Sequence, residues 1–370
     1  MKSTNGQKIL IAFFLVIILA PNVFWLFFKD YFDTANYENR SKLEKPSIEL
    51  AHLPDFPEQY EDYYNDSLPF RNQLIKLNSK IEYYIFKNSS HEDVIVGKNG
   101  WLFYNKKADG DPVATYKGLV LFTEEELEQI AGNLEKSEKK LADMGCEFVL
   151  YIAPNKERVY YEEMPDYYGM PAEYYKVGQL VEYLEEHTDI RIVYPYHELM
   201  EAKSNFSDLD LYHRVDTHWN SAGGYIGGTV LLHELGIDMP AIGDDSLSIQ
   251  PVSNQFADLA NYLNLGSELN TEKDYSITGY ESHNPVTVKD EFFGEWSFKC
   301  DATADSRKLL MARDSFCTAM ITVIASQFRE SCMIHHDGFS DDMIEKYEPD
   351  IFVYELVERN IPLLSAFCFE

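Results

Sequence analysis

A serine in the setting of a nucleophile, Ser315, follows the apolar run Leu309–Ala312. A turn at Arg313-Asp314 ends this run, and a helix-compatible segment, residues 316–328, begins directly after the serine. Where a strand passes into a helix, the hydroxyl projects from the sheet edge, and the free N–H groups of the first helical turn can hold an oxyanion. The sequence therefore predicts Ser315 as a nucleophile, with the backbone N–H groups of Ser315 and Phe316 as the oxyanion hole.

A histidine and an aspartate that could activate this serine occur together in the segment Val215-Asp216-Thr217-His218. A serine needs a general base, and a histidine base needs a carboxylate that fixes its orientation. Each motif also has a simpler interpretation, because Asp-Ser-Phe is a common helix N-cap and Asp-x-His a common structural pair. Both motifs follow apolar, strand-like runs, which favours one site in which His218 is the base and Asp216 its orienting acid.

Strand-like and helix-like segments alternate from residue 94 onward. The expected strands are a hairpin of 94–97 and 101–104, then 146–153, 190–194, 309–312 and 349–355; the expected helices are 123–144, 172–187, 196–203, 221–235, 316–328 and 343–348. This alternation predicts a mostly parallel α/β sheet, whose ligands bind at the carboxyl ends of the strands. The polar interval 236–299 breaks the rhythm and is expected to be an insertion that shapes the substrate cleft.

The N-terminal residues predict a membrane anchor. Residues 9–28 are apolar except for Pro21 and Asn22, and a helix of this length reaches about 30 Å, enough to cross a bilayer. Lys2 and Lys8 precede it, which places the N-terminus in the cytoplasm and the rest outside. A cleaved signal peptide is the alternative, although the residues before Pro21 form a poor cleavage site. The expected organisation is an anchor (1–30), a stalk with an amphipathic helix over 72–86 (31–93) and a catalytic domain (94–370).

The composition excludes some partners. The 62 acidic residues outnumber the 32 basic ones and give a formal net charge of −30. This charge disfavours nucleic acid, whose binding depends on Lys and Arg at the phosphates. The five cysteines show no zinc-ligand spacing, and a disulfide between two of them stays open. His213, His218, His335, His336 and Asp337 could be grouped as metal ligands, but adjacent histidines point in different directions, so neither a metal nor a cofactor is expected.

Five short segments, in chain order, are similar to those of a known family. They are Gly100–Phe103, Pro154–Lys156 with Tyr160, Asp216–Asn220, Arg313–Phe316, and Pro349–Ile351 through to Arg359. In this order they resemble the DHHW proteins, which are similar to the SGNH-hydrolase-like O-acetyltransferases of alginate acetylation. The resemblance extends over roughly residues 50–362. Thr217 stands where the family's name has a His, which leaves the subfamily and the substrate open. The alginate-type enzymes also carry Thr there, so the difference is compatible with catalysis.

The resemblance implies a flavodoxin-like, three-layer α/β/α sandwich and acyl transfer through Ser315, His218 and Asp216. Members of the family are membrane-anchored or exported, and they modify extracytoplasmic polysaccharides, often beside a multi-pass membrane acyltransferase. This chain is accordingly expected to be a cell-membrane O-acetyltransferase that acts on a surface or exported polysaccharide through an acyl-serine. Aromatic faces and long polar side chains suit sugars, and the candidates to line the cleft are Lys156, Tyr160, Tyr212, Trp219, Trp296 and Arg313.

Other functions remain compatible with the sequence. A carbohydrate esterase would use the same acyl-enzyme, and what separates it from a transferase is whether water or a sugar hydroxyl reaches the intermediate first. A non-catalytic surface protein that binds glycan would keep the fold but show no serine reactivity. A peptidase is disfavoured only by the resemblance.

Overall fold

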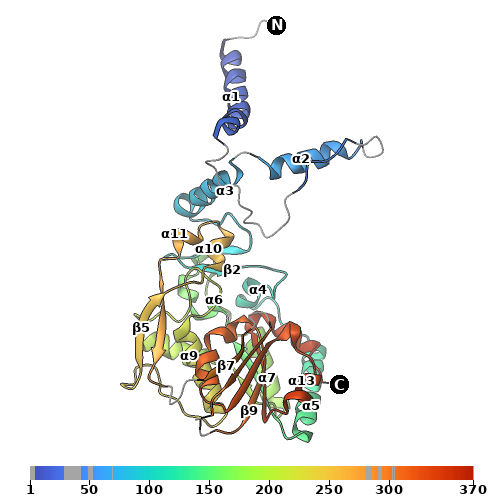
Figure 1. The fold of residues 1–370 in the computed structure, drawn as a ribbon, viewed down its shortest axis with the longest axis vertical. Helices are drawn as coiled ribbons and strands as arrows, with labels where there is room; N and C mark the ends of the chain where they lie inside the picture. The colour runs from blue at the N-terminus through green and yellow to red at the C-terminus, as the bar shows by residue number, and fades with distance from the viewer. Residues whose placement is uncertain are drawn as a thin grey trace. The chain divides into compact units, whose positions relative to one another are not determined.

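The computed structural model of the protein describes residues 5–28, 43–48, 53–68, 70–280, 285–290, 294–301, 303 and 305–369. The chain divides into two compact units, Met1–Lys87 and Asn88–Glu370, whose elements are labelled in Figure 1. The smaller unit contains helices α1 (Asn5–Phe28), α2 (Phe56–Asp66) and α3 (Arg71–Lys80), and a π-helical segment, η3 (Ile81–Phe86), continues α3. The predicted helix over 72–86 is thus α3 together with η3.

The expected transmembrane helix is wrong. Among the residues described, no helix combines the length and the apolar character that crossing a membrane requires. The prediction treated Pro21 and Asn22 as exceptions within an apolar stretch over 9–28, although Pro21 lacks a backbone N–H and Asn22 is a polar amide. Lys2, on which the expected orientation partly rested, lies outside the described residues.

A sheet of seven strands, in the order β4-β3-β11-β9-β10-β8-β7, forms the centre of the larger unit as described. Its strands are β3 (Glu147–Ala153), β4 (Ile192–Val193), β7 (Val286–Asp290), β8 (Glu295–Lys299), β9 (Lys308–Arg313), β10 (Glu330–His335) and β11 (Ile351–Val357). From β4 to β10 each pair is parallel, and β8 and β7 are added antiparallel. Apart from the membrane helix, this mixed and mostly parallel sheet agrees with the predicted α/β fold.

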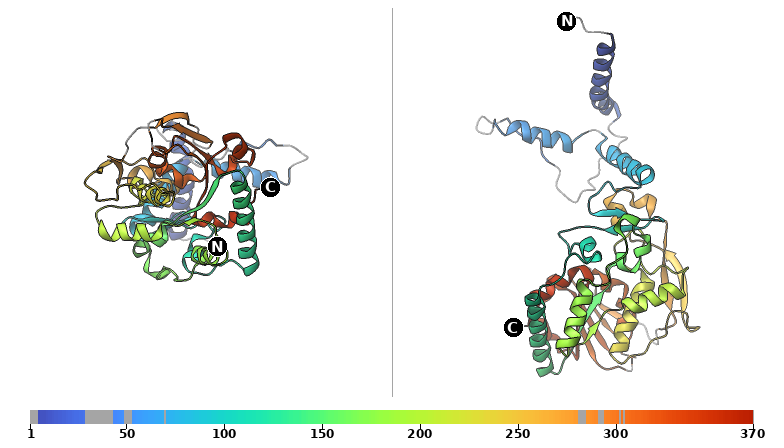
Figure 2. Two further views of the ribbon diagram at one scale, coloured as in Figure 1. Left: turned by 90° about the horizontal axis from the view of Figure 1, so that it is seen from below. Right: turned by 180° about the vertical axis from the view of Figure 1, so that it is seen from behind.

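Helices cover both faces of the sheet. Along β3, Val149 and Tyr151 belong to one hydrophobic core, and Leu150 and Ile152 to the other, because successive side chains of a strand point to opposite faces. The first core is completed by α8 (Tyr196–Asn205), α9 (Ser221–Glu234) and α12 (Ile321–Ala325), and the second by α5 (Glu124–Asp143), α7 (Lys176–His187) and α13 (Asp342–Tyr347). Figure 2 shows the strands between α9 on one side and α5 on the other, which makes three layers.

Shorter elements surround the sandwich. The hairpin β1 (Val94–Val96) and β2 (Leu102–Tyr104) turns through Asn99-Gly100, both with positive φ, the turn chemistry that joins two strands tightly. Within residues 236–299, β5 (Ser248–Ser253) pairs with β6 (Lys273–Thr278), and α10 (Asp258–Tyr262) and α11 (Gly266–Leu269) lie between them in the chain. The remaining short helices are α4 (Pro112–Tyr116), α6 (Lys156–Val159), η4 (Tyr161–Glu163), η5 (Asp166–Tyr168), η6 (Ser315–Ala319), η7 (His336–Gly338) and η8 (Glu358–Ser365).

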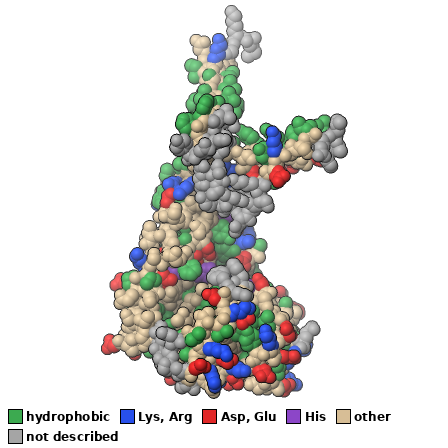
Figure 3. Space-filling model, in the orientation of Figure 1, with side chains coloured by type: hydrophobic (Ala, Val, Ile, Leu, Met, Phe, Trp, Pro, Cys, Tyr) green, Lys and Arg blue, Asp and Glu red, His purple; other side chains and the backbone are tan. Residues whose placement is uncertain are grey.

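The helix expected over 316–328 is divided into the 3₁₀ helix η6 and the short α12. β-Branched residues dominate α12, and their restricted χ1 angles lower helix propensity, so packing decides the local form. None of the five cysteines, all of which lie in the described residues, forms a disulfide. On the face drawn in Figure 3, acidic and basic side chains are interspersed over the larger unit.

Candidate active site

Ser315 lies at the carboxyl end of β9, where the strand passes into η6. Asp314 fixes this turn: its Oδ1 accepts the Phe316 N–H at 2.8 Å, and its Oδ2 accepts the Val357 N–H at 2.7 Å. The Asp314 N–H donates to a carboxyl oxygen of Glu355 at 2.8 Å. Because Val357 and Glu355 belong to β11, which pairs with β9, these bonds hold Ser315 at the edge of the sheet.

Asp216 and His218 lie in a tight loop that is closed by antiparallel pairing of the segments on either side. Tyr212 pairs with Trp219, and the His213 N–H donates to the His218 carbonyl oxygen at 3.1 Å. Inside the loop, Asp216 Oδ1 accepts the backbone N–H of His218 at 3.0 Å. The carboxylate and the imidazole are therefore held in one compact turn.

Lys156 supports this loop from α6, directly after β3. Its Nζ donates to the carbonyl oxygens of Asp216 at 2.6 Å, His213 at 3.1 Å and Arg214 at 3.4 Å. Burial lowers the pKa of Lys156 to about 8, although nearby carboxylates oppose the shift, so the side chain stays charged at pH 7. An ammonium engaged with backbone carbonyls positions the loop; the structure does not bring Lys156 to a substrate cleft, where the sequence placed it.

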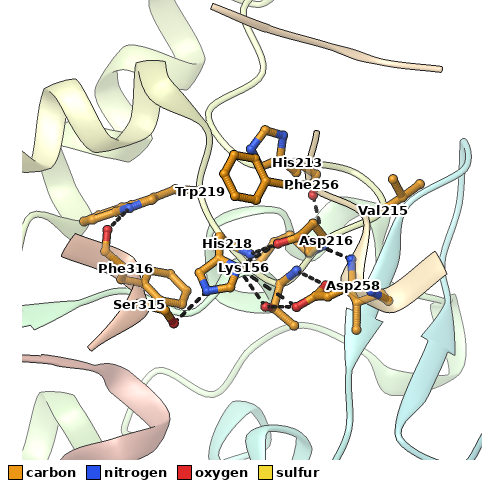
Figure 4. A network of polar contacts seen from close by, with 12 residues as sticks. Lys156, His213, Val215, Asp216, His218, Trp219, Phe256, Asp258, Ser315 and Phe316 are labelled. Atoms are coloured by element: carbon orange, nitrogen blue, oxygen red, sulfur yellow. Dashed lines mark hydrogen bonds and ion pairs between the residues drawn. The ribbon is translucent and has the colours of Figure 1, made fainter. Parts of the chain in front are cut away.

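The three side chains predicted as a triad meet at this edge of the sheet, as Figure 4 shows. His218 Nε2 is 2.7 Å from Ser315 Oγ, and His218 Nδ1 is 2.7 Å from Asp216 Oδ1. A carboxylate at Nδ1 favours the tautomer with its proton there, which leaves Nε2 to accept the hydrogen bond of the serine hydroxyl. A histidine in this arrangement is able to take the serine proton.

Interactions within the group shift the pKa values of its acid and base in opposite directions. Burial alone would raise the pKa of Asp216, but the hydrogen bonds from His218 and Asp258 and the charge of His218 hold it well below its usual range. Burial would lower the pKa of His218, yet the hydrogen bond and the charge of Asp216 raise it above its usual value. Asp216 is therefore ionised at neutral pH, and His218 is a stronger base than a free imidazole.

A second carboxylate, Asp258 of α10, was missed by the sequence reasoning. Its backbone N–H donates to Asp216 Oδ2 at 2.7 Å, and its side chain accepts the Thr217 hydroxyl at 2.6 Å and the Thr217 N–H at 2.8 Å. Burial and the charge of Asp216 raise the pKa of Asp258 to about 6. No local sequence pattern marks this residue, because it approaches from the interval 236–299.

A cavity of about 270 Å³ lies beside Ser315 and His218. Its walls include the aromatic side chains of Trp219, Phe256 and Phe316, and its polar groups include His213 and Asp274. Eight of its twelve lining residues are polar or titratable, so a ligand in this cavity can form several hydrogen bonds beside the aromatic faces. Phe256, Asp258 and Asp274 show that the interval 236–299 contributes to this cavity.

The structure brings one of the predicted substrate-binding residues, Trp219, to the cavity wall. Two others are buried and bonded to the backbone: Tyr160 Oη accepts the Leu211 N–H at 2.8 Å, and Tyr212 Oη donates to the Pro154 carbonyl oxygen at 2.6 Å. These tyrosines hold the segment before the Asp216 loop against the end of β3.

Arg313 and Trp296, also predicted to bind substrate, stack on each other within the sheet. The guanidinium carbon of Arg313 is 4.2 Å from the Trp296 ring centre, and Trp296 Nε1 donates to Asp290 at 2.7 Å. Neither belongs to the lining of the cavity beside Ser315 in the described part of the chain.

The two N–H groups predicted to hold an oxyanion are in different situations. The Phe316 N–H already donates to Asp314, whereas the Ser315 N–H has no hydrogen-bond partner among the described residues. Of these two groups, the Ser315 N–H can receive a ligand oxygen without first losing a bond.

Two groups of described residues hold potential metal-binding atoms within 4.8 Å of one another. One is Asp216, His218 and Asp258, whose atoms are engaged in the hydrogen bonds above. In the other, His335 and His336, the imidazoles stack with ring centroids 4.6 Å apart, so the expectation that they point in different directions is wrong. Their Nδ1 atoms lie 3.5 and 3.2 Å from the carboxylate of Asp337.

Replacing Lys156 by methionine is expected to lower the free energy of unfolding by about 2–4 kcal/mol, because buried carbonyl groups lose their donor. It is also expected to lower kcat/KM for an ester substrate, since the loop that carries Asp216 loses its support. Urea unfolding and steady-state kinetics measure both effects. Lys203→Met is the matched control, because Lys203 also donates to a backbone carbonyl, that of Val159, away from this loop. Equal effects of the two variants on kcat/KM would contradict the positioning role.

Comparisons with known proteins agree with this fold. Solved structures that match include Bacillus cereus PatB1 with a sulfonyl adduct, with a TM-score of 0.55 and 14% identity over 75% of this chain and 100% of that chain. A DHHW family protein from Eubacterium siraeum matches with a TM-score of 0.51 and 12% identity over 75% and 98%. The O-acetyltransferase domain of Pseudomonas putida AlgJ matches less closely, with a TM-score of 0.46 and 17% identity over 73% and 92%.

The TM-scores of the PatB1 and DHHW structures, both above 0.5, show a shared fold, and at such low identities they show nothing more. The family is decided by sequence. Comparison with curated protein sequences finds no significant match. The family described as the SGNH hydrolase-like domain of the acetyltransferase AlgX, in contrast, matches residues 94–295, more than half of the chain. The matched range includes the Asp216 loop, Asp258 and Asp274, and Ser315 lies beyond it. The chain therefore belongs to the family of AlgX-type, SGNH hydrolase-like acetyltransferase domains.

Proposed function

We propose that the protein is an O-acetyltransferase that modifies an extracytoplasmic polysaccharide through an acetyl-serine at Ser315. The observation that carries the proposal is the continuous hydrogen-bonded path from Asp216 through His218 to Ser315, with 2.7 Å at each link, beside a cavity. Membership of an acetyltransferase family supports the acetyl group as the one transferred.

The proposed reaction has two halves. In the first, Ser315 Oγ attacks the carbonyl carbon of the acetyl donor while its proton moves to His218 Nε2. The donor oxygen leaves with that proton, and the acetyl-serine ester remains. In the second half, a sugar hydroxyl attacks the ester carbonyl, His218 takes the hydroxyl proton and returns it to Ser315, and the acetylated sugar departs. Asp216 stabilises the imidazolium that forms in each half.

The setting of the reaction rests on the family resemblance alone. We propose an extracytoplasmic location and, as the source of acetyl groups, a multi-pass membrane acyltransferase. An exported polysaccharide is the proposed acceptor because members of the family that the sequence resembles modify such polymers.

Labelling with an aryl sulfonyl fluoride tests the nucleophile. We expect the peptide that contains Ser315 to gain one sulfonyl group, detected by mass spectrometry of the digested protein, and Ser315→Ala to remain unlabelled. One structure of the related PatB1 contains a sulfonyl adduct, so this chemistry suits the fold. Ser204→Ala, which alters an exposed serine of α8, is the control and should be labelled like the wild type. A folded wild-type protein without label at Ser315 would favour a glycan-binding protein instead.

A further inference from the structure

A second histidine, His213, lies beside the proposed catalytic group and takes no part in it. Its side chain is 2% exposed and lines the same cavity as Ser315. Neither of its ring nitrogens makes a hydrogen bond to a described residue: Nδ1 is buried without a partner, and Nε2 lies 4.0 Å from Oδ2 of Asp274. Nearly all buried polar atoms are hydrogen-bonded, so a buried imidazole with unused capacity at the wall of a cavity is a candidate for ligand binding.

The ladder that closes the Asp216 loop explains why this imidazole faces the cavity. Pairing of Tyr212 with Trp219 places His213 opposite His218, and side chains at opposite positions of an antiparallel pair lie on the same face. Figure 4 shows His213 next to the ring of Phe256, and their ring centroids are 5.3 Å apart. One side of the imidazole is thus covered by an aromatic ring.

Asp274 of β6 faces the same imidazole. His213 Nε2 and Asp274 Oδ2 are 4.0 Å apart, too far for a direct hydrogen bond. The other carboxylate oxygen, Oδ1, accepts the backbone N–H groups of Ser221 at 3.0 Å and Tyr275 at 2.7 Å, which fixes the orientation of the carboxylate. One ligand oxygen placed about 2.8 Å from both His213 and Asp274 would bridge them.

The bridging atom must accept a hydrogen bond and donate one. Burial lowers the pKa of His213, so the imidazole is neutral at pH 7, and the nearby carboxylate favours its proton on Nε2. The bridging oxygen then accepts from Nε2–H and donates to Asp274. A hydroxyl oxygen does both, whereas the carbonyl oxygen of an acetyl group only accepts.

We propose that His213 and Asp274 form a subsite for one hydroxyl group of the acceptor sugar, with Phe256 against the sugar ring. The proposal rests on the proposed function, because it assigns the acceptor side of that reaction. The subsite also distinguishes the acceptor from the donor, since the acetyl group of the donor has no hydroxyl for His213 and Asp274 to bind. The two residues are positioning residues and take no proton in the reaction.

The test measures how the acetyl-enzyme divides between a sugar and water. The full-length protein is incubated with p-nitrophenyl acetate and either cellotetraose or chitotetraose. Mass spectrometry gives the acetylated oligosaccharide, and an acetate assay gives hydrolysis. Both products come from the same acetyl-serine, so a change in the rate of acylation or in the folded fraction cancels in their ratio.

We expect His213→Phe and Asp274→Asn each to lower the ratio of transfer to hydrolysis about tenfold or more, because each removes one hydrogen bond to the acceptor. The double variant is expected to fall by no more than about twofold further, since both residues hold one hydroxyl. His233→Phe and Asp238→Asn are the matched controls, because these residues form an exposed His–Asp pair at 2.8 Å. In each control variant, the ratio of transfer to hydrolysis should equal that of the wild type.

Two results would overturn the subsite alone. One is a ratio within about twofold of the wild type in both His213→Phe and Asp274→Asn; the other is a wild-type protein that forms the acetyl-serine but transfers nothing to either oligosaccharide. A folded wild-type protein that forms no acetyl-serine would overturn the proposed function, and the subsite with it. The two failures are therefore distinguishable.

Discussion

Replacing Ser315 by alanine is expected to lower kcat/KM for p-nitrophenyl acetate by about 10⁴-fold or more, because the nucleophile of a cooperating triad has no substitute. His218 stays in place in this variant, since its Nδ1 and backbone N–H remain bonded to Asp216. An imidazole alone can still activate water weakly, so a small residual hydrolysis is compatible with the prediction. Steady-state release of p-nitrophenol measures the effect.

The same variant is expected to remain folded. Its side chain loses one hydrogen bond, that to His218 Nε2, and a single hydrogen bond contributes about 1 kcal/mol to stability. The free energy of unfolding in urea should therefore change little, while the turnover is lost. Ser204→Ala is the control for both measurements. Full turnover by folded Ser315→Ala would mean that another residue is the nucleophile.

The meeting of Ser315 with His218 could be predicted from the sequence because it follows from topology. Ser315 comes directly after an apolar run, and parallel strands end at one edge of a sheet, where the loops that follow them gather. The Asp216 loop is held at the same edge by the pairing of Tyr212 with Trp219, which closes the loop, and by the bond from Lys156 to the Asp216 carbonyl oxygen. The sequence predicted that Ser315 and His218 lie at the same edge of the sheet. The observed distance of 2.7 Å between Ser315 Oγ and His218 Nε2 follows from that shared edge and from the position of the Asp216 loop.

The direction of individual side chains could not be predicted in the same way. Lys156, Tyr160 and Tyr212 have the polar or aromatic character of sugar-binding residues, but each is bonded to a backbone group of the loop segments instead. Backbone carbonyl and N–H groups buried in loops need partners, and long side chains with one polar tip supply them. Composition alone does not distinguish this role from ligand binding.

Residues from the interval 236–299 were missed for a different reason. Asp258 and Asp274 lie in the polar interval 236–299, and nothing in the pattern around either residue shows that it reaches the Asp216 loop. Their place at the cavity depends on how this interval folds back over the Asp216 loop, through the bonds of Asp258 to Asp216 and of Asp274 to Ser221. Contacts between segments so distant leave no local pattern. His213 gave a signal, since it directly precedes the loop, but its opposition to His218 required knowing the pairing.

Replacing Asp216 by asparagine is expected to lower kcat/KM at neutral pH by about 10³–10⁴-fold, because the imidazolium loses the carboxylate that stabilises it. The amide has one oxygen for the three donors that Asp216 accepts, the His218 backbone N–H, His218 Nδ1 and the Asp258 N–H. When that oxygen stays with the Asp258 N–H, the amide N–H faces His218 Nδ1 and favours the tautomer whose proton is on Nε2. That proton then points at Ser315 Oγ, so the imidazole donates a hydrogen bond where it should accept a proton. Asp238→Asn is the matched control, because Asp238 Oδ1 lies 2.8 Å from Nδ1 of the exposed His233, the same pair of atoms as in Asp216 and His218. This variant should keep full activity.

The pH dependence makes this prediction specific to the charge of Asp216. In the wild type, kcat/KM should rise as His218 loses its proton, with a midpoint above pH 6.5, because Asp216 raises the pKa of His218. In Asp216→Asn the midpoint should move to lower pH, since burial then lowers the pKa of His218 with less opposition. The opposition that remains comes from Asp258, whose Oδ2 is 4.0 Å from His218 Nδ1. Without the charge of Asp216, the pKa of Asp258 falls from about 6, so Asp258 stays ionised over more of the pH range. The double variant, Asp216→Asn with Asp258→Asn, should therefore have the lowest midpoint of the three proteins. If the single and the double variant both had the midpoint of the wild type, neither carboxylate would determine the pKa of His218.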